Sequence, residues 1–445
     1  MSLSLLVVLL TSLYAVPGTS RSTHHPQPPR KHCTVKHNHD GSDDSANILH
    51  AFTACATDSV ITFSPANYSA YTPITLARLN NVVIHLNGNL LLPNNIEEVQ
   101  RKINVSTNQP STYATPWFYF HGSNVQLIGS AEFEWGRFYG FGNHWWDLGV
   151  RTLRPQLATF NITNGLMRNL KVIKPVAWGW NLPGTDLRVE NHFVDAKPDN
   201  GTRWNTVVSR FASISRDTTS LSMGTECLFP ENTYASLIMH RYYGHNGDDC
   251  ISIINGAQNY WVSWKQRVIP NCTGRRVQKL DHGRSGLWSE SNWTGGAGFA
   301  DNVTWEDIKL VNVSTAIFLT QKISNIPFQS LGPPPNVTSN SSTHISNFKY
   351  KNFHGGLNAN WTCITPVCWN FVEGGDATQS IIFDLYPGTA LNISVGRIKV
   401  HPFEKPYTET TVICDPETLV PGEQATLGFN CTRGAYVRTP IGSSG

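Results

Sequence analysis

The sequence lacks any apolar stretch of the roughly 20 residues needed to cross a bilayer, and it carries little charge. Only 15% of its 445 residues are charged, and the formal net charge is +3. Binding of nucleic acid usually requires a dense basic patch, which this balance does not provide. Neither a membrane nor a nucleic acid is therefore expected as a partner.

The longest N-terminal apolar stretch runs from Leu3 to Val16 and is followed by small and turn-forming residues. This pattern is typical of a cleavable secretory signal, although no Lys or Arg precedes the apolar stretch. A membrane anchor is the competing interpretation, but the stretch is too short to span a bilayer. The sequence thus predicts a signal peptide over residues 1–20 and an extracellular protein.

Acceptor tripeptides for N-linked glycans are dense, as expected for an exported glycoprotein. Their asparagines are Asn67, Asn104, Asn161, Asn200, Asn271, Asn292, Asn302, Asn312, Asn336, Asn340, Asn360, Asn392 and Asn430.

The nine cysteines show no paired CxxC spacing typical of a zinc site. In an exported chain they predict disulfide bonds, and we expect neither a metal nor a cofactor. Three candidate pairs are Cys33 with Cys55, Cys363 with Cys368, and Cys414 with Cys431. Cys250 and Cys272 are further candidates. The three pairs leave Cys227, Cys250 and Cys272. Because three cysteines cannot all pair with one another, at least one of them is unpaired or bonded to another chain.

One helix is predicted near the start of the folded part. Residues 21–40 are rich in Pro, His and basic residues and predict an exposed leader. The segment Ser45–Ala56 then places Ile48, Leu49, Phe52 and Cys55 on one helical stripe. The acidic start at residues 43–44 suits the N-terminus of a helix. Such a helix would cap the end of a solenoid.

From about Asn80 onward, short β-branched and aromatic runs alternate with Asn, Gly and Asp at intervals of roughly 20 to 30 residues. This cadence predicts an all-β, single-stranded parallel β-helix, with a β-sandwich as the alternative. No linker divides the body, so we expect one domain over residues 41–435 and a flexible tail over 436–445. The stretch Pro327–Ser342 is expected to form a long glycosylated loop.

The segment Tyr242–Ile254, YYGHNGDDCISII, holds two adjacent carboxylates after a turn-forming Asn-Gly. Neighbouring acids on a strand face opposite sides, so both reach one groove only at a turn or bulge. Two close carboxylates repel, which keeps one protonated while the other is ionised. Asp248 and Asp249 therefore suit acid–base glycosidic cleavage. Acidic pairs are also common in ordinary loops.

These residues resemble the polygalacturonase family of pectin hydrolases (glycoside hydrolase family 28), in particular its fungal exo-acting galacturonan and rhamnogalacturonan hydrolases. The likeness extends from about Cys33 to Cys431. It includes the strings at Trp178–Gly184, His192–Arg203, Asn246–Cys250, Gly298–Phe318 and Val412–Gln424.

The resemblance implies a right-handed parallel β-helix of the pectin lyase-like type and metal-free, inverting hydrolysis. It also implies that Asp248 is the general acid that protonates the leaving oxygen. Asp249 would then be one of two carboxylates that activate water.

The sequence departs from the family pattern at the second water-activating acid. Where the family has Asn-Thr-Asp, this chain has Asn232-Thr233-Tyr234. A phenol, whose pKa is near 10, cannot replace a carboxylate base near neutral pH. The family's Gly-His-Gly corresponds to Asp281-His282-Gly283, which makes His282 the candidate catalytic histidine. An exposed loop histidine is the alternative.

The family's Arg-x-Lys, which binds a substrate carboxylate, is missing from Ser289–Gly296. The literal Arg397-Ile398-Lys399 lies far downstream, and we interpret it as a coincidence. The departures cluster in the windows Trp204–Ile238 and Tyr260–Glu290. Either the enzyme has lost its base, or the sequence derives from a gene model with a misplaced splice boundary or a frame error; the latter is favoured.

The leading functional hypothesis is a monomeric, secreted exo-hydrolase that acts on the galacturonan or rhamnogalacturonan backbone of pectin. The missing acid and clamp also permit a non-catalytic pectin-binding β-helix. A pectate lyase shares the solenoid but needs a calcium site of several carboxylates, and no such acidic cluster is present.

Overall fold

A computed structural model of the chain describes most of the body. The described residues are 30–107, 116–150, 153–177, 179–182, 184–199, 212–214, 234–245, 249–254, 261–273, 276–281, 298–301, 303–313, 315–320, 343–360, 372, 374–385, 388, 390–414, 427–428 and 437–441. Within these ranges, no helix is both long enough and apolar enough to cross a membrane.

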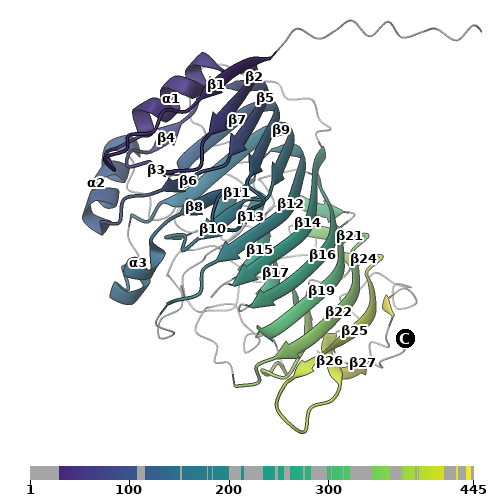
Figure 1. Cartoon of the computed structure of the whole chain (residues 1–445). Helices are drawn as coiled ribbons and strands as arrows, with labels where there is room; N and C mark the ends of the chain where they lie inside the picture. Colours follow the sequence, from purple (N-terminus) through teal and green to yellow (C-terminus); the bar gives the residue numbers. More distant parts are fainter. Residues whose placement is uncertain are drawn as a thin grey trace, which may run out of the picture. The chain divides into compact units, whose positions relative to one another are not determined.

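Parallel strands stack on one another along most of the described chain (Figure 1). In the longest series, each strand pairs in parallel with the next. Its members are β1 (Lys31–Thr34), β2 (Thr57–Phe63), β5 (Leu79–Leu86), β7 (Pro116–Gly129), β9 (Gln156–Arg168), β12 (Thr185–Asp195), β14 (Tyr234–His245), β16 (Trp261–Thr273), β19 (Val303–Val313), β22 (Lys349–Leu357) and β25 (Ser394–Pro402).

Two further parallel series belong to the same sheet. The first joins β4 (Ile74–Thr75), β7, β9, β11 (Trp180–Asn181), β13 (Ala212–Ile214), β15 (Asp249–Ile254) and β17 (Arg276–Asp281). The second joins β3 (Asn67–Ser69), β6 (Asn89–Leu91), β8 (Arg137–Tyr139) and β10 (Lys171–Ile173).

The C-terminal part continues the stack in two smaller sheets. One contains β18 (Gly298–Asp301), β21 (Thr343–Ser346) and β24 (Ala390–Leu391). The other contains β20 (Ile317–Thr320), β23 (Ile381–Asp384), β26 (Thr410–Cys414) and β27 (Val437–Ile441). Among the described pairings, β26 with β27 alone is antiparallel. The predicted parallel β-helix is therefore confirmed.

Asparagine ladders explain the regular asparagines of the sequence. The Asn191 amide donates to the Asn169 side-chain oxygen one rung away, 22 residues earlier, at 3.0 Å. The Asn164 amide donates to Asn124 at 2.7 Å. All four have positive φ values of 49–57°, a conformation that Asn tolerates better than most residues. Each ladder thus satisfies polar groups at a turn that most side chains disfavour.

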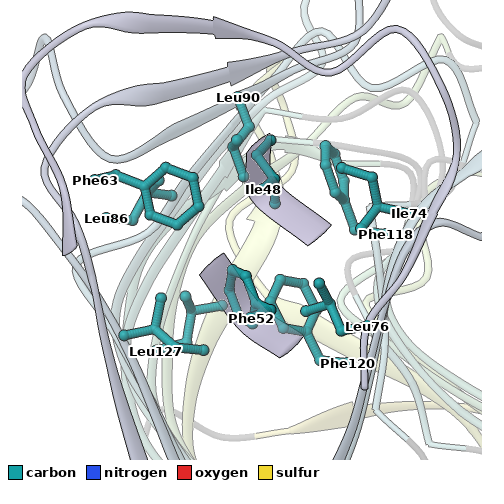
Figure 2. Close-up of a pocket in the computed structure, with 11 residues that line it drawn as sticks. Ile48, Phe52, Phe63, Ile74, Leu76, Leu86, Leu90, Phe118, Phe120 and Leu127 are labelled. Carbon is teal, nitrogen blue, oxygen red and sulfur yellow. The ribbon is translucent and has the colours of Figure 1, made fainter. Parts of the chain in front are cut away.

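Helix α1 (Ser45–Ala54) closes the N-terminal end of the apolar interior, as predicted. Figure 2 shows Ile48 and Phe52 pointing from α1 into a cavity that is lined only by aliphatic and aromatic side chains. Its walls offer no polar group to a ligand, so this cavity is a packing space of the core. Helices α2 (Ile96–Thr107) and α3 (Gly142–Leu148) were not predicted.

The acidic pair before α1 caps the helix through Asp43 but not through Asp44: Asp43 Oδ1 accepts a bond from the Ser45 backbone N–H at 3.0 Å. Asp44 occupies the N-cap position but makes no side-chain capping bond. Its carboxylate instead accepts bonds from the backbone N–H groups of Asn38, at 2.6 Å, and Ser69, at 2.9 Å. Asp43 accepts a bond from the Thr72 hydroxyl at 2.7 Å. The pair therefore joins α1 to the first rungs.

We expect Asp44→Asn to lower the free energy of unfolding by about 2 kcal/mol, because a fully buried amide cannot accept both backbone bonds. Denaturant unfolding measures this loss. The matched control is Asp58→Asn at an exposed position, which we expect to cost less than about 0.5 kcal/mol. Equal losses in the two variants would contradict the assigned role.

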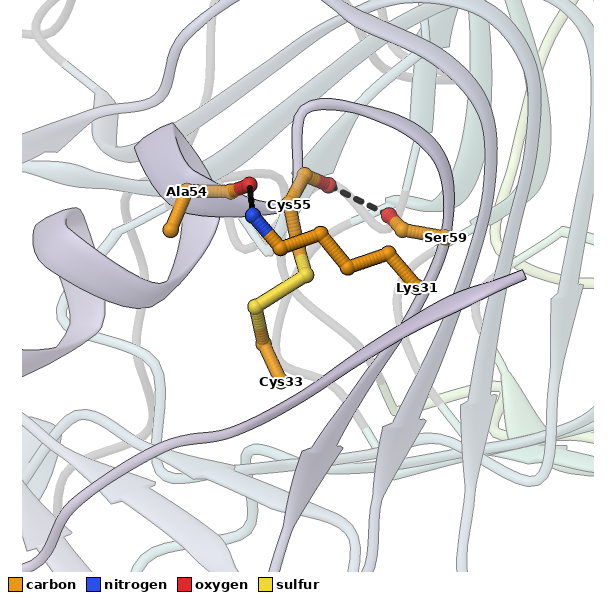
Figure 3. The surroundings of a disulfide bond; sticks show 5 residues. All are labelled: Lys31, Cys33, Ala54, Cys55 and Ser59. Carbon is orange, nitrogen blue, oxygen red and sulfur yellow. Dashed lines mark hydrogen bonds between the residues drawn. A yellow bond between two sulfur atoms is a disulfide. The ribbon is translucent and has the colours of Figure 1, made fainter. Parts of the chain in front are cut away.

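A disulfide bond between Cys33 and Cys55 ties β1 to the end of α1, as predicted (Figure 3). The Lys31 ammonium also bonds the Ala54 carbonyl at 2.7 Å. The β-helix therefore includes residues ahead of the expected boundary at residue 41, because β1 pairs with β2. Likewise, β27 extends into the segment 436–445, where a flexible tail was expected.

The other predicted disulfide candidates are only partly described. Cys414 is disulfide-bonded, but its predicted partner Cys431 lies outside the described residues, as do Cys363 and Cys368. Cys250 lies in β15 and Cys272 in β16. Their side chains are not described, so their pairing stays a prediction.

A histidine is buried in the core of β12. His192 is 1% exposed, and its ring centroid lies 6.2 Å from that of Trp180. Burial, and to a lesser degree the charge of Lys171, lowers its pKa from 6.5 to about 3. The folded protein therefore holds this ring neutral at pH values where the unfolded chain takes up a proton.

The linkage predicts that His192 lowers stability as the pH falls from about 6.5 toward about 3, because protons bind preferentially to the unfolded state. His192→Leu should flatten the slope of unfolding free energy against pH by up to ~1.4 kcal/mol per pH unit. Denaturant unfolding between pH 6 and pH 4 measures the slope. His50→Leu, at an exposed position of α1, is the matched control for loss of a histidine that is not buried.

Candidate functional site

The predicted catalytic segment lies between β14 and β15. Strand β14 ends at His245 and β15 begins at Asp249. Asp248 lies outside the described residues, and the Asp249 side chain is not described. The backbone of Asp249 is paired with Arg276 of β17. The proposed roles of the two acids therefore stay predictions.

The third predicted residue, His282, also lies outside the described residues. The preceding residue, Asp281, pairs with Ile254 at the far end of β15. Since Asp249 and Ile254 are five residues apart on one strand, about 16 Å separates their positions. The described register therefore does not bring Asp281 to the end of β15 that Asp249 occupies.

The departure at Tyr234 falls at the start of β14, where its backbone pairs with Trp261 of β16. The Tyr234 side chain is not described. Arg397-Ile398-Lys399, interpreted above as a coincidence, lies within β25.

Residues at the ends of four neighbouring strands are paired next to the predicted catalytic turn. Tyr139 of β8 pairs with Ile173 of β10, Ile173 with Asp195 of β12, and Asp195 with His245 of β14. Neighbouring paired strands lie about 4.8 Å apart. The chain that leaves β12 at Asp195 therefore starts directly beside the chain that leaves β14 at His245 toward Asp248.

Lys174 joins the turns at this edge. Its side chain is 8% exposed, and its Nζ lies 3.1 Å from Asp195 Oδ2 and 2.9 Å from Asp199 Oδ1. The same Nζ donates to the backbone carbonyl of Lys197. One cation thus binds the beginning, middle and end of the turn over residues 195–199.

Helix α3 supports the same turn from the side. The Asn143 amide donates to Asp199 Oδ2, and the Trp146 indole N–H donates to the Val176 carbonyl at 3.3 Å. A Cβ atom on Gly142 would lie only 2.4 Å from the Pro175 carbonyl oxygen. A side chain at Gly142 would therefore push α3 away from this edge.

A second buried lysine shapes the neighbouring loop. Lys171 Nζ donates to the backbone carbonyls of Ser130, Glu132 and Trp135 at 2.7–2.8 Å. This loop carries Phe133, which is 52% exposed. The lysine therefore fixes an exposed aromatic side chain through backbone contacts alone.

Aromatic side chains continue from that loop across two strands. The Phe133 ring meets Phe193 edge-on at 5.2 Å, and Phe193 stacks on Tyr243 with ring centroids 5.0 Å apart and planes within 3°. Burial raises the pKa of Tyr243, and the negative charge of Asp195 adds to the effect. Tyr243 thus lies close to the turn over residues 195–199.

Lys174, Asp195 and Asp199 were not predicted as site residues, although Asp195 and Asp199 belong to the string His192–Arg203 that carried the resemblance. Their contacts join residues about one rung apart, which sequence spacing alone did not reveal. In the described part of the chain, no group of three or more His, Cys, Asp or Glu side chains is placed to hold a metal ion.

We expect Lys174→Met to lower the free energy of unfolding by about 3 kcal/mol, because it leaves Asp195 and Asp199 without their buried cation. Thermal or denaturant unfolding measures the loss. The control is Lys351→Met, because the Lys351 side chain is 53% exposed and forms an ion pair with Glu306. Its loss should stay below about 1 kcal/mol. A similar loss in both variants would show that Lys174 has no special role.

The chain is similar to fungal proteins over almost its whole length. It is 29% identical to a protein described as probable exopolygalacturonase C from Aspergillus niger, over 97% of this chain and 98% of that protein. A protein of the same description from Aspergillus flavus is 26% identical, with the same coverage. No family model matches the chain.

A solved structure supports the fold. The endo-xylogalacturonan hydrolase from Aspergillus tubingensis matches with a TM-score of 0.53 at 16% identity, and the match covers 91% of this chain and 100% of that one. This likeness agrees with the right-handed parallel β-helix predicted from the sequence. The predicted resemblance to the polygalacturonase family, glycoside hydrolase family 28, is therefore confirmed along nearly the whole chain.

Proposed function

We propose that the chain is a glycoside hydrolase that cleaves the galacturonan or rhamnogalacturonan backbone of pectin from the chain end. The main support is the 29% identity, over 97% of its length, to a protein described as a probable exopolygalacturonase. The parallel β-helix, in which β14 ends at His245 and β15 begins at Asp249, is consistent with this activity.

In the proposed mechanism, Asp248 donates its carboxyl proton to the glycosidic oxygen as the C–O bond breaks. Asp249 takes a proton from the water that attacks the anomeric carbon from the opposite face. One water is consumed and the configuration inverts. Such a division of roles requires two carboxyl groups with different pKa values, which close placement produces.

A non-catalytic pectin-binding protein is the second candidate. Tyr234 stands where the family has a second water-activating acid, and a phenol is not ionised near neutral pH. Loss of this acid costs orders of magnitude in turnover. Binding of polygalacturonate without release of reducing sugar would favour this alternative.

We also propose that the protein is exported and glycosylated. The apolar N-terminal stretch and the dense acceptor tripeptides support both proposals. Among the described acceptors, four are exposed: Asn67, Asn161, Asn312 and Asn360. Monomeric behaviour stays an expectation.

We expect Asp248→Asn to abolish release of reducing ends from polygalacturonate, because an amide cannot donate the proton. Reducing-sugar assays in the presence of a calcium chelator, with absorbance detection of unsaturated products, distinguish hydrolysis from lyase action. The control is Asp186→Asn, a change of the same kind at an exposed position of β12. Unchanged turnover in the Asp248 variant would overturn the assignment of the general acid.

A further inference from the structure

We propose that Lys197 binds a carboxylate of the pectic substrate next to the predicted catalytic turn. The inference rests on the proposed function and deepens it, because it names a residue that distinguishes free galacturonate from its methyl ester. The residue belongs to the turn over residues 195–199, all of which the structure describes.

The backbone of Lys197 is fixed on both sides while its side chain is exposed. Its N–H donates to Asp195 Oδ1 at 3.0 Å, and its carbonyl accepts a bond from the buried Lys174 ammonium. The residue itself is exposed. Such a turn presents a cation from an ordered backbone, which lowers the entropy lost when a ligand binds.

The neighbouring carboxylates are satisfied by other donors. Asp195 accepts bonds from Lys174 and from the Lys197 backbone, and Asp199 accepts bonds from Lys174 and Asn143. Within the described part of the chain, the Lys197 ammonium forms no ion pair with a carboxylate. Its charge is therefore available to an incoming anion.

Other cations of the adjacent strands have partners. Arg168 and Arg188 both pair with Glu190, at 2.7 and 2.5 Å. The ammonium of Lys171 is surrounded by backbone carbonyls, and the guanidinium of Arg137 lies 4.9 Å from the centre of the Phe133 ring. Among these described cations, Lys197 is best placed to bind a substrate carboxylate.

The register places Lys197 near the reaction. Asp195 and His245 are paired, about 4.8 Å apart across the sheet. Lys197 follows Asp195 by two residues, and Asp248 follows His245 by three. The cation and the predicted acid therefore belong to segments that leave adjacent strands at the same edge.

The ligand chemistry follows from the substrate. Each galacturonate unit of pectin carries one carboxylate, and a charge-assisted bond to an ammonium is about twice as strong as a neutral hydrogen bond. Methyl esterification removes that charge. Lys197 would therefore favour galacturonan that is not esterified.

Calorimetric binding of trigalacturonate and of its methyl ester to the full chain tests this inference. We expect Lys197→Met to weaken binding of trigalacturonate by about tenfold or more and to leave binding of the ester unchanged. Lys197→Arg should retain most of the affinity. The matched control is Lys349→Met, at an exposed position of β22, which should bind trigalacturonate as the wild type does.

The outcomes separate the two proposals. If the wild type binds trigalacturonate and Lys197→Met binds it equally well, the role of Lys197 is wrong and the proposed function stands. If Lys197→Met weakens the acid and the ester alike, carboxylate recognition is wrong. If the wild type neither binds nor hydrolyses any pectic substrate, the proposed function fails, and this inference fails with it. Equal thermal unfolding of the variants confirms that each one is folded.

Discussion

The in-register stacking of one rung on the next is the constraint on which the rest of the structure depends. Each strand of the main series pairs in parallel with its predecessor and its successor, so each residue faces a fixed position one rung away, as Val189 faces Met167 and Met239. Apolar side chains thereby form continuous interior columns, while asparagines form ladders at the turns. Because both kinds of column need the same register, a slip of one residue would disrupt them together.

The same register organises the polar edge beside the predicted catalytic turn. Lys174 directly follows β10 in the chain, and its ammonium binds the turn over residues 195–199, which belongs to the next rung. That turn starts where Asp195 pairs with His245. A short series of contacts between rungs therefore connects a buried cation to the start of the segment that holds Asp248. The positions of these groups are set by the stack rather than by local sequence.

Much of the architecture could be predicted from the sequence because its signals are local and repeated. The spacing of short strands predicted the β-helix, the stripe through Ile48 and Phe52 predicted the capping helix, and the Cys33–Cys55 pair was correctly chosen. The side-chain bonds of Asp44, at the N-cap position, were not predicted, because its partners include Ser69, 25 residues away. Such contacts form only between stacked rungs, and the spacing of residues in the sequence does not predict them. For Asp248, Asp249 and His282, the sequence remains the only basis for their roles.

The asparagine ladders also bear on which acceptor tripeptides can carry sugar. Asn392 belongs to an acceptor tripeptide, yet its half-buried side-chain nitrogen donates to Asn347 on the preceding rung at 2.5 Å. A β-helix needs Asn at left-handed turns and favours Thr or Ser along the strands that follow. Stacking alone therefore generates Asn-x-Ser/Thr strings. The density of such strings in a solenoid therefore depends on its architecture as well as on glycosylation during export. The number of attached glycans should be smaller than the number of acceptor tripeptides.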